Sequence, residues 1–221
     1  MSHPAPLSPS AAPATAPTAP TTAPSVDWPS PQRRAAFEAW LAPLIAPHQL
    51  QAASLRPASA DASFRRYLRL DTATPGASCI VMDAPPDKEN CRPFVQVQAL
   101  LAQAGLSVPQ ILAWDEAQGF MLLSDLGTQT VIERLDPERP QDAFAWYQQA
   151  TDTLLQWQLA SRPGVLPPYD EALLRRELAL FPDWYIAQHR GTVLDDAQQA
   201  VLSHAFNRIV AHNLAAPSVF V

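Results

Sequence analysis

A serine and two arginines lie close together in residues 60–66, where their groups could hold an anion. Ser63 offers a hydroxyl, and Arg65 and Arg66 offer guanidinium groups. Such groups assist backbone N–H groups in binding phosphate oxygens. An ordinary hairpin turn with solvated arginines explains the same residues, and residue chemistry alone favours that interpretation.

The other reactive groups form no catalytic or metal-binding pattern. Asp170 and Asp195 each stand beside a second acid before a helical stretch, where carboxylates cap helices and interact favourably with the helix dipole. Neither of the two cysteines, Cys79 and Cys91, has a metal-ligand spacing with any of the five histidines. We therefore interpret both cysteines as ordinary buried thiols.

Composition limits the class of protein. The chain has 221 residues, a net charge of -6, and 48% hydrophobic residues, enough for one large domain or two lobes. Lysine and arginine form only short pairs, which argues against a nucleic-acid partner. No apolar run is long enough to span a bilayer, and the N-terminus lacks the basic start and apolar core of a signal peptide. We therefore expect a cytoplasmic protein with no membrane association.

The elements that must position these residues change in type along the chain. Residues 1–31 hold nine of the 24 prolines and few large side chains, which predicts a disordered tail. A helix is predicted over 32–44, with Phe37 and Leu41 on its apolar face. A further helix runs from Pro93 to a C-cap at Gly105. Strands are predicted at 54–56, 66–71, 79–82, 110–115 and 119–124.

Helices predominate after residue 127. Asp136 followed by proline predicts a helix start, Asp170 predicts a cap, and Asp195 with Gln198 predicts a capping box. The apolar stretch Pro217–Val221 predicts a final strand. Strands followed by helices indicate an α+β architecture, with a strand-rich lobe in 32–127 and a partial helical lobe in 128–221.

Four segments carry a family resemblance: Asp61–Tyr67, Ile80–Pro86, Gly105–Pro109 and Gly119–Gly127. They resemble the aminoglycoside phosphotransferase family, and more narrowly its N-acetylmuramate/N-acetylglucosamine anomeric kinases of cell-wall recycling. The resemblance covers about residues 51–221. It implies a protein-kinase-like bilobal fold and transfer of a phosphoryl group from ATP, with Mg²⁺, to the anomeric hydroxyl of an amino sugar.

The resemblance also implies a nucleotide site. The 60–66 turn would cover the ATP phosphates through backbone N–H groups and the side chains of Ser63, Arg65 and Arg66. The segment Ser124–Leu126 would be the hinge whose backbone reads the adenine edge, with Leu123 behind the adenine. A plain connector between two lobes fits Ser124–Leu126 equally well.

The third strand departs from the protein-kinase pattern. Protein kinases hold ATP with a lysine on this strand that pairs with a glutamate in the following helix. Here the strand reads Ile80–Asp83 with no lysine, and Gln96 stands where the glutamate would be. Lys88 lies just beyond the strand and could substitute, although a solvated surface lysine is the simpler interpretation.

The sequence ends at Val221, where the resemblance places the strand that leads into the catalytic loop. That loop would supply the aspartate base and an asparagine ligand for Mg²⁺, with a further aspartate on the next strand. We therefore assign no catalytic or metal-binding residue. We expect the Mg²⁺ ligands beyond Val221 and an inactive 221-residue chain.

Other interpretations stay open. The acceptor could be an aminoglycoside, a choline-like alcohol or another small hydroxyl compound. The aromatic residues Phe181, Trp184 and Tyr185 lie where the resemblance places the acceptor sugar, but helical spacing favours packing. A noncatalytic kinase-like binding module would explain the missing lysine and glutamate, but we expect it to expose apolar surface around Trp157 and Phe220.

Overall fold

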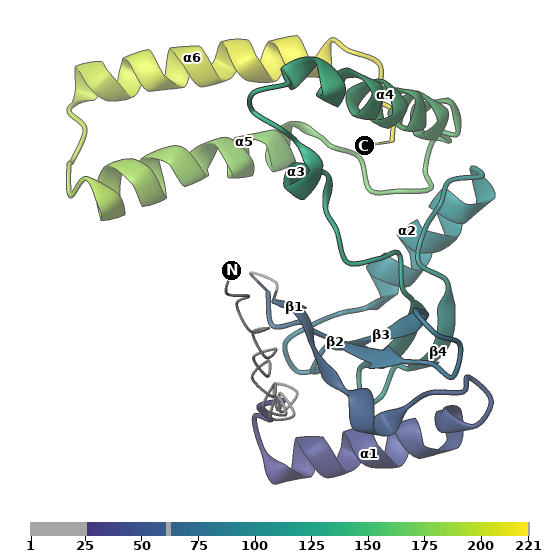
Figure 1. The fold of residues 1–221 in the computed structure, drawn as a ribbon. Helices are drawn as coiled ribbons and strands as arrows, with labels where there is room; N and C mark the ends of the chain where they lie inside the picture. The colour runs from purple at the N-terminus through teal and green to yellow at the C-terminus, as the bar shows by residue number, and fades with distance from the viewer. Residues whose placement is uncertain (1–25, 61–62, 221) are drawn as a thin grey trace, which may run out of the picture. The chain divides into compact units, whose positions relative to one another are not determined.

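The computed structural model describes residues 26–60 and 63–220. Most of the predicted tail, residues 1–25, lies outside the described residues. The chain divides into two compact units. Figure 1 colours the chain by residue number. Unit 1 comprises the chain up to Arg92 together with Pro109–Asp125, and unit 2 comprises Pro93–Val108 together with Leu126–Val221. A sheet in unit 1 and helices in unit 2 confirm the predicted α+β class.

The sheet of unit 1 has five strands, and every neighbouring pair is antiparallel. The spatial order is β1 (Arg56–Ala60), β2 (Arg66–Asp71), β3 (Ser78–Asp83), β5 (Phe120–Ser124) and β4 (Ile111–Asp115). Strand β2 has the predicted bounds, because alternating polar and apolar side chains define a strand with two different faces.

The strand predicted at 54–56 was wrong. Residues Ala52–Ser54 form a single 3₁₀ turn, and β1 begins only at Arg56, opposite Arg69. The Ser54 hydroxyl donates to the carbonyl of Gln51 at 2.6 Å and accepts the N–H of Asp71 at 2.8 Å. This local hydrogen bonding by a serine competes with strand pairing.

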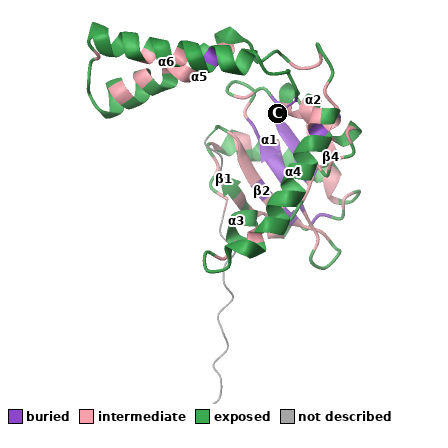
Figure 2. Ribbon diagram, turned by 90° about the horizontal axis from the view of Figure 1, so that it is seen from above, coloured by how far each residue is buried: buried purple, intermediate pink, exposed green. Residues whose placement is uncertain are grey.

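One face of the sheet is covered by α1 (Pro31–Ile45). Ser30 caps this helix by accepting the N–H of Arg33, as expected for a serine before a helix that begins with proline. Phe37 and Leu41 are buried on the sheet, as predicted. Trp28, assigned from sequence to the tail, packs against Phe37 with ring centroids 4.8 Å apart. In Figure 2 the buried residues of unit 1 gather in the strands.

Strand register assigns side chains to the two faces. Leu68, Val81 and Leu122 lie in register across β2, β3 and β5, and all three belong to the core under α1. Successive side chains in a strand point to opposite faces. Therefore Met82 and Met121, which pair with each other, lie on the face opposite α1.

Unit 2 contains the helices α2 (Arg92–Gln103), α3 (Val131–Arg134), α4 (Ala143–Leu159), α5 (Glu171–Leu180) and α6 (Asp196–Leu214). A π-helical segment, η3 (Phe181–His189), continues α5, and α5 and α6 lie side by side (Figure 1). The predicted caps of α5 by Asp170 and of α6 by Asp195 are confirmed. None of the helices in the described ranges is long and apolar enough to cross a membrane.

Two sequence expectations in unit 2 were wrong. The helix expected after Asp136 begins only at Ala143, because Asp136 closes a turn by accepting the N–H groups of Glu138 and Arg139. Pro217–Phe220 forms no strand.

Phe220 is instead buried in a small cluster. Its ring lies 4.6 Å from that of Trp157, Leu100 completes the cluster, and the Phe220 N–H donates to the Ser161 hydroxyl at 2.8 Å. Trp157 and Phe220 are 6% and 7% exposed, but their sequence neighbours Leu155 and Val219 are 51% and 42% exposed, so apolar surface remains beside the buried pair.

Among the described glycines, Gly119 leaves the least room for a side chain. It has a φ of +70°, and its carbonyl accepts the N–H of Ala84 at 2.9 Å. A Cβ at this position would lie 1.9 Å from the carbonyl oxygen of Ala84. Neither the conformation nor the space admits a side chain.

We predict that Gly119→Ala lowers the free energy of unfolding by about 2–4 kcal/mol, through left-handed strain plus a backbone clash. Gly76→Ala is the matched control, because Gly76 has a φ of +77° and nothing within 4 Å of an added Cβ. The control should lose only about 1 kcal/mol. Denaturant unfolding of the 221-residue chain measures both, and equal losses would contradict the clash.

Candidate functional site

A fully buried carboxylate at the end of β3 organises the region around the predicted phosphate turn. Asp83 is 0% exposed and forms ion pairs with Arg33 of α1 and Arg66 of β2. Its Oδ1 accepts from Arg33 Nε at 3.0 Å, and its Oδ2 accepts from Arg66 Nε at 3.1 Å. The carboxylate therefore has a charged partner on each oxygen, as burial of a charge requires.

Both arginines are held by further contacts. Arg33 donates to the Gln118 carbonyl at 2.6 Å, and its guanidinium lies 3.8 Å from the Phe120 ring centroid. Arg66 donates to the Asp27 carbonyl and lies 4.9 Å from the Trp28 ring centroid. The sequence-predicted phosphate ligand Arg66 thus belongs to a buried ion-pair network on the α1 face.

The predicted ligand Arg65 is also paired, but with Glu89. Arg65 Nε donates to one Glu89 oxygen at 3.1 Å, and the backbone N–H of Phe64 donates to the other at 3.0 Å. The Ser63 hydroxyl accepts the N–H of Arg65 at 3.2 Å. Burial lowers the pKa of Arg65, but the charge of Glu89 and a hydrogen bond with Tyr67 leave that pKa raised overall. Residues 61 and 62 of the turn lie outside the described residues.

The predicted adenine-side residues lie at the end of β5. Leu123 is buried, and it pairs with Ile80 of β3 on the face opposite α1. The Ser124 hydroxyl accepts the N–H of Gln110 at 2.8 Å, and the Ser124 N–H donates to the carbonyl of Gln110. Leu126 is 63% exposed and is the first residue of unit 2 after the sheet.

Sequence reasoning missed the ion pair that holds the end of β5. Asp125 accepts from Arg69 at 2.6 Å and from the Ser78 hydroxyl at 2.6 Å. Arg69 and Asp125 are 15% and 6% exposed at their side chains, so the pair is shielded from solvent. The only signals in the sequence were Arg69 within the strand predicted at 66–71 and Asp125 directly after the strand predicted at 119–124. This pair fixes the chain where the boundary between the two units begins.

Acidic, histidine and cysteine side chains form no metal-binding cluster among the described residues. No group of three or more His, Cys, Asp or Glu side chains among them could hold a metal. The two cysteines are free and buried, as predicted, and burial raises the pKa of both thiols.

The aromatic residues of η3 are more exposed than helical packing predicts. Phe181, Trp184 and Tyr185 are 48%, 66% and 48% exposed. The rings of Phe181 and Tyr185 stack with centroids 5.5 Å apart, and Tyr185 stacks in turn on His189. The packing interpretation is therefore wrong for these side chains within the described residues.

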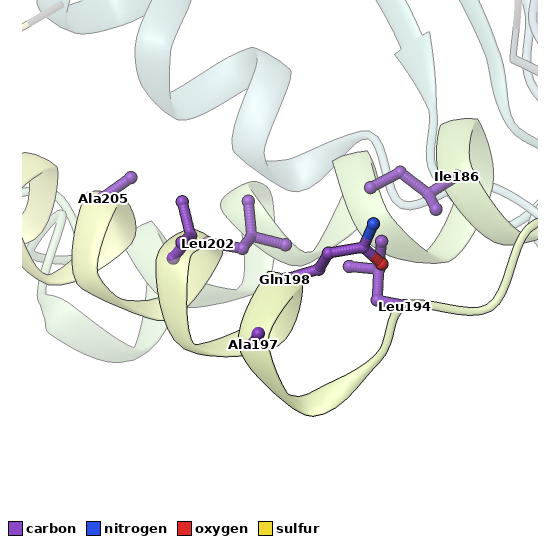
Figure 3. A pocket seen from close by; sticks show the side chains of 7 residues that line it. Ile186, Leu194, Ala197, Gln198, Leu202 and Ala205 are labelled. Carbon is purple, nitrogen blue, oxygen red and sulfur yellow. The ribbon is translucent and has the colours of Figure 1, made fainter.

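A pocket in unit 2 lies between η3 and α6 (Figure 3). Its lining is aliphatic apart from Gln198, whose side-chain oxygen accepts the N–H of Asp195 in the α6 capping box. The lining has no cation for a phosphate and no free array of polar groups for a sugar. The full lining is Ile186, Leu194, Ala197, Gln198, Val201, Leu202 and Ala205.

Comparison with known proteins gives one family and three consistent relatives. Residues 54–221 match the APH family, described as the phosphotransferase enzyme family. The N-acetylmuramate/N-acetylglucosamine kinase of Pseudomonas aeruginosa is 50% identical over 169 residues, which are 76% of this chain and 48% of that protein. The kinase of the same name from Pseudomonas putida is 46% identical over 173 residues, which are 78% of this chain and 50% of that protein.

A third relative of the same name, from Neisseria meningitidis serogroup B, is 37% identical over 191 residues. The match covers 86% of this chain and 55% of that protein. The chain thus spans about half the length of the curated relatives it matches.

We predict that Asp83→Asn lowers the free energy of unfolding by about 2–4 kcal/mol, because it leaves two guanidinium groups without a counter-charge. We expect a loss in the lower part of the range for breaking a buried ion pair, because the side chains of Arg33 and Arg66 keep 15% and 28% exposure. Urea unfolding of the 221-residue chain, followed by tryptophan fluorescence, measures the loss.

Asp71→Asn is the matched control. Asp71 pairs with Arg56 at 2.7 Å, but the two side chains are 43% and 32% exposed, so the loss should stay within about 1 kcal/mol. The hydrogen bond from Arg56 lowers the pKa of Asp71, so this small contribution is present at neutral pH and disappears as the pH falls through that lowered pKa. Equal losses for the two variants would contradict the special role of Asp83.

Proposed function

Because the chain belongs to the phosphotransferase enzyme family, we propose that the complete protein is an ATP-dependent sugar kinase of the cytoplasm. Its acceptor is the anomeric hydroxyl of N-acetylmuramate or N-acetylglucosamine, which places it in cell-wall recycling. The identity of 50% to a kinase named for these two sugars is the observation that carries this proposal. The likeness extends over 76% of the chain and includes the whole sheet of unit 1.

The reaction would be an in-line transfer. The anomeric oxygen forms a bond to the γ-phosphorus of ATP, the bond from that phosphorus to the bridging oxygen breaks, and ADP leaves. The hydroxyl proton passes to a base. Such transfers depend mainly on positioning and charge neutralisation. We place that base and the Mg²⁺ ligands beyond Val221.

The role of residues 1–221 in this proposal is to hold the nucleotide. Ser63, Arg65 and the turn around them would face the phosphates, while Leu123 and the backbone of Ser124–Leu126 would face the adenine. Arg66 would act indirectly, because its pairing with Asp83 fixes the first residue of β2. The indirect role of Arg66 is supported by its ion pair with Asp83.

A noncatalytic nucleotide-binding module is the second candidate. The absence of a lysine on β3 supports it. Phe220 and Trp157 are buried against each other, but the exposed side chains of their sequence neighbours Leu155 and Val219 still argue against such a module. Activity of the complete protein separates the two candidates.

We predict that the complete protein, with ATP and Mg²⁺, converts N-acetylglucosamine or N-acetylmuramate to a sugar 1-phosphate. Proton and phosphorus NMR should show loss of the free anomeric signals and a phosphorus signal coupled to the anomeric proton. The 1-O-methyl glycoside of the same sugar is the matched control, because it has no free anomeric hydroxyl. Phosphorylation of that glycoside would overturn the anomeric assignment, and no product from either sugar would favour the binding module.

We predict that the 221-residue chain forms no sugar phosphate under the same conditions, because we place the base and metal ligands beyond Val221. The same NMR measurement tests this, with the complete protein as the positive control. Turnover by the 221-residue chain would mean that the described residues contain an acceptor base that we have not identified.

A further inference from the structure

The cations of the phosphate turn are already neutralised by neighbouring carboxylates. Arg65 pairs with Glu89, and Arg66 pairs with the buried Asp83. A bound polyphosphate carries several negative charges, and phosphoryl transfer sites neutralise them with a cation beside the loop that covers them. The described turn therefore needs a further positive group if it is to hold ATP.

Lys88 supplies such a group, and it is the sole lysine of the chain. It is exposed on the connector between β3 and α2, and its Nζ lies 4.8 Å from the ring centroid of Phe64 in the turn. Among the described residues Lys88 forms no ion pair, in contrast to Arg65 and Arg66. A cation–π contact at an exposed site is worth only about 0.5–1 kcal/mol, so an anion can draw the ammonium away from the ring.

The position of Lys88 is fixed by the folding of the connector. The N–H groups of Lys88 and Glu89 both donate to the carbonyl of Pro85 at 2.9 Å, forming a tight turn just after β3. The Glu89 carboxylate then joins that turn to the phosphate turn through Phe64 N–H and Arg65. Two segments far apart in sequence are thereby held together, with the ammonium of Lys88 beside Phe64.

We propose that Lys88 is the phosphate-binding cation of the nucleotide site and acts from the β3–α2 connector in place of a lysine on β3. The assignment rests on the proposed function, since it takes ATP as the ligand. Met82, the residue before Asp83, is fully buried on the face of the sheet opposite α1 and carries no charge. Asp87 is the one opposing charge next to Lys88 in sequence that no described ion pair occupies.

The first test is nucleotide binding by the 221-residue chain, with calorimetric titration of ATP and of adenosine. Lys88→Met should weaken ATP binding about tenfold, as expected for a charge-assisted hydrogen bond at an exposed site, and leave adenosine binding unchanged. Arg34→Met is the matched control: it removes one positive charge from an exposed pair on α1 and should change neither affinity. Asp87→Asn should strengthen ATP binding, because it removes the neighbouring negative charge.

The second test needs no variant and so does not depend on the folding of Lys88→Met. Because Lys88 is the only lysine, acetylation of the intact chain modifies one ε-amine besides the N-terminus. ATP should slow acetylation of Lys88 severalfold, and adenosine should not. Mass spectrometry of the peptide that contains Lys88 gives the rates, with the N-terminal amine as the internal reference.

Each result bears on a separate claim. Equal ATP affinity in Lys88→Met and the unmodified chain, or no protection of Lys88 by ATP, overturns the assignment of Lys88 and leaves the sugar kinase proposal standing. If ATP binding depends on Lys88 but the complete protein phosphorylates neither sugar, the assignment of Lys88 is supported and the sugar kinase proposal is overturned. Equal weakening of ATP and adenosine in Lys88→Met would overturn a phosphate-specific role.

Discussion

Burial of one carboxylate constrains how unit 1 is built. Asp83 has no exposed surface, so its charge is tolerated only while Arg33 and Arg66 remain in place. These arginines lie 50 and 17 residues away in sequence, one on the helix that covers the sheet and one on the neighbouring strand. The network therefore joins α1, β2 and β3 at the same end of the sheet. The rings of Phe120 and Trp28 beside the two guanidinium groups extend it to β5 and the segment before α1.

This constraint gives the two faces of the sheet different side chains. On the α1 face, β2, β3 and β5 carry the core residues Leu68, Val81 and Leu122 and, at one end of the sheet, the Asp83 network. The predicted adenine-side residue Leu123 lies on the other face, next to Ile80. Arg66 is on the first face because it is in register with Asp83. The charge of Arg66, which the sequence resemblance assigns to the phosphates, is thus directed to Asp83 on the α1 face.

The sequence predicted the helices and strands better than it predicted which charged side chains pair with each other. The alternation in 66–71 and the caps at Asp170 and Asp195 are local signals, and the structure confirms them. The later start of α4 depends on a turn around Asp136 that competes with a proline-led helix. The pairing of Arg66 with Asp83 depends on the β2–β3 register, which single-strand patterns do not supply. An aspartate at the end of the apolar run Ile80–Met82 was the only sign of it.

The absence of a lysine on β3 is consistent with the packing around that strand. Met82 is fully buried, so a lysine there would lose its hydration and require a carboxylate within reach. Gln96, which the sequence resemblance puts in the place of the kinase glutamate, is neutral and donates from its amide nitrogen to the Val165 carbonyl at 3.1 Å. β3 therefore has no lysine, and α2 has no glutamate, with which the usual ion pair could form. A cation on an exposed connector avoids this requirement, because water solvates it until an anion binds, and its desolvation is then offset by the ligand's own charge.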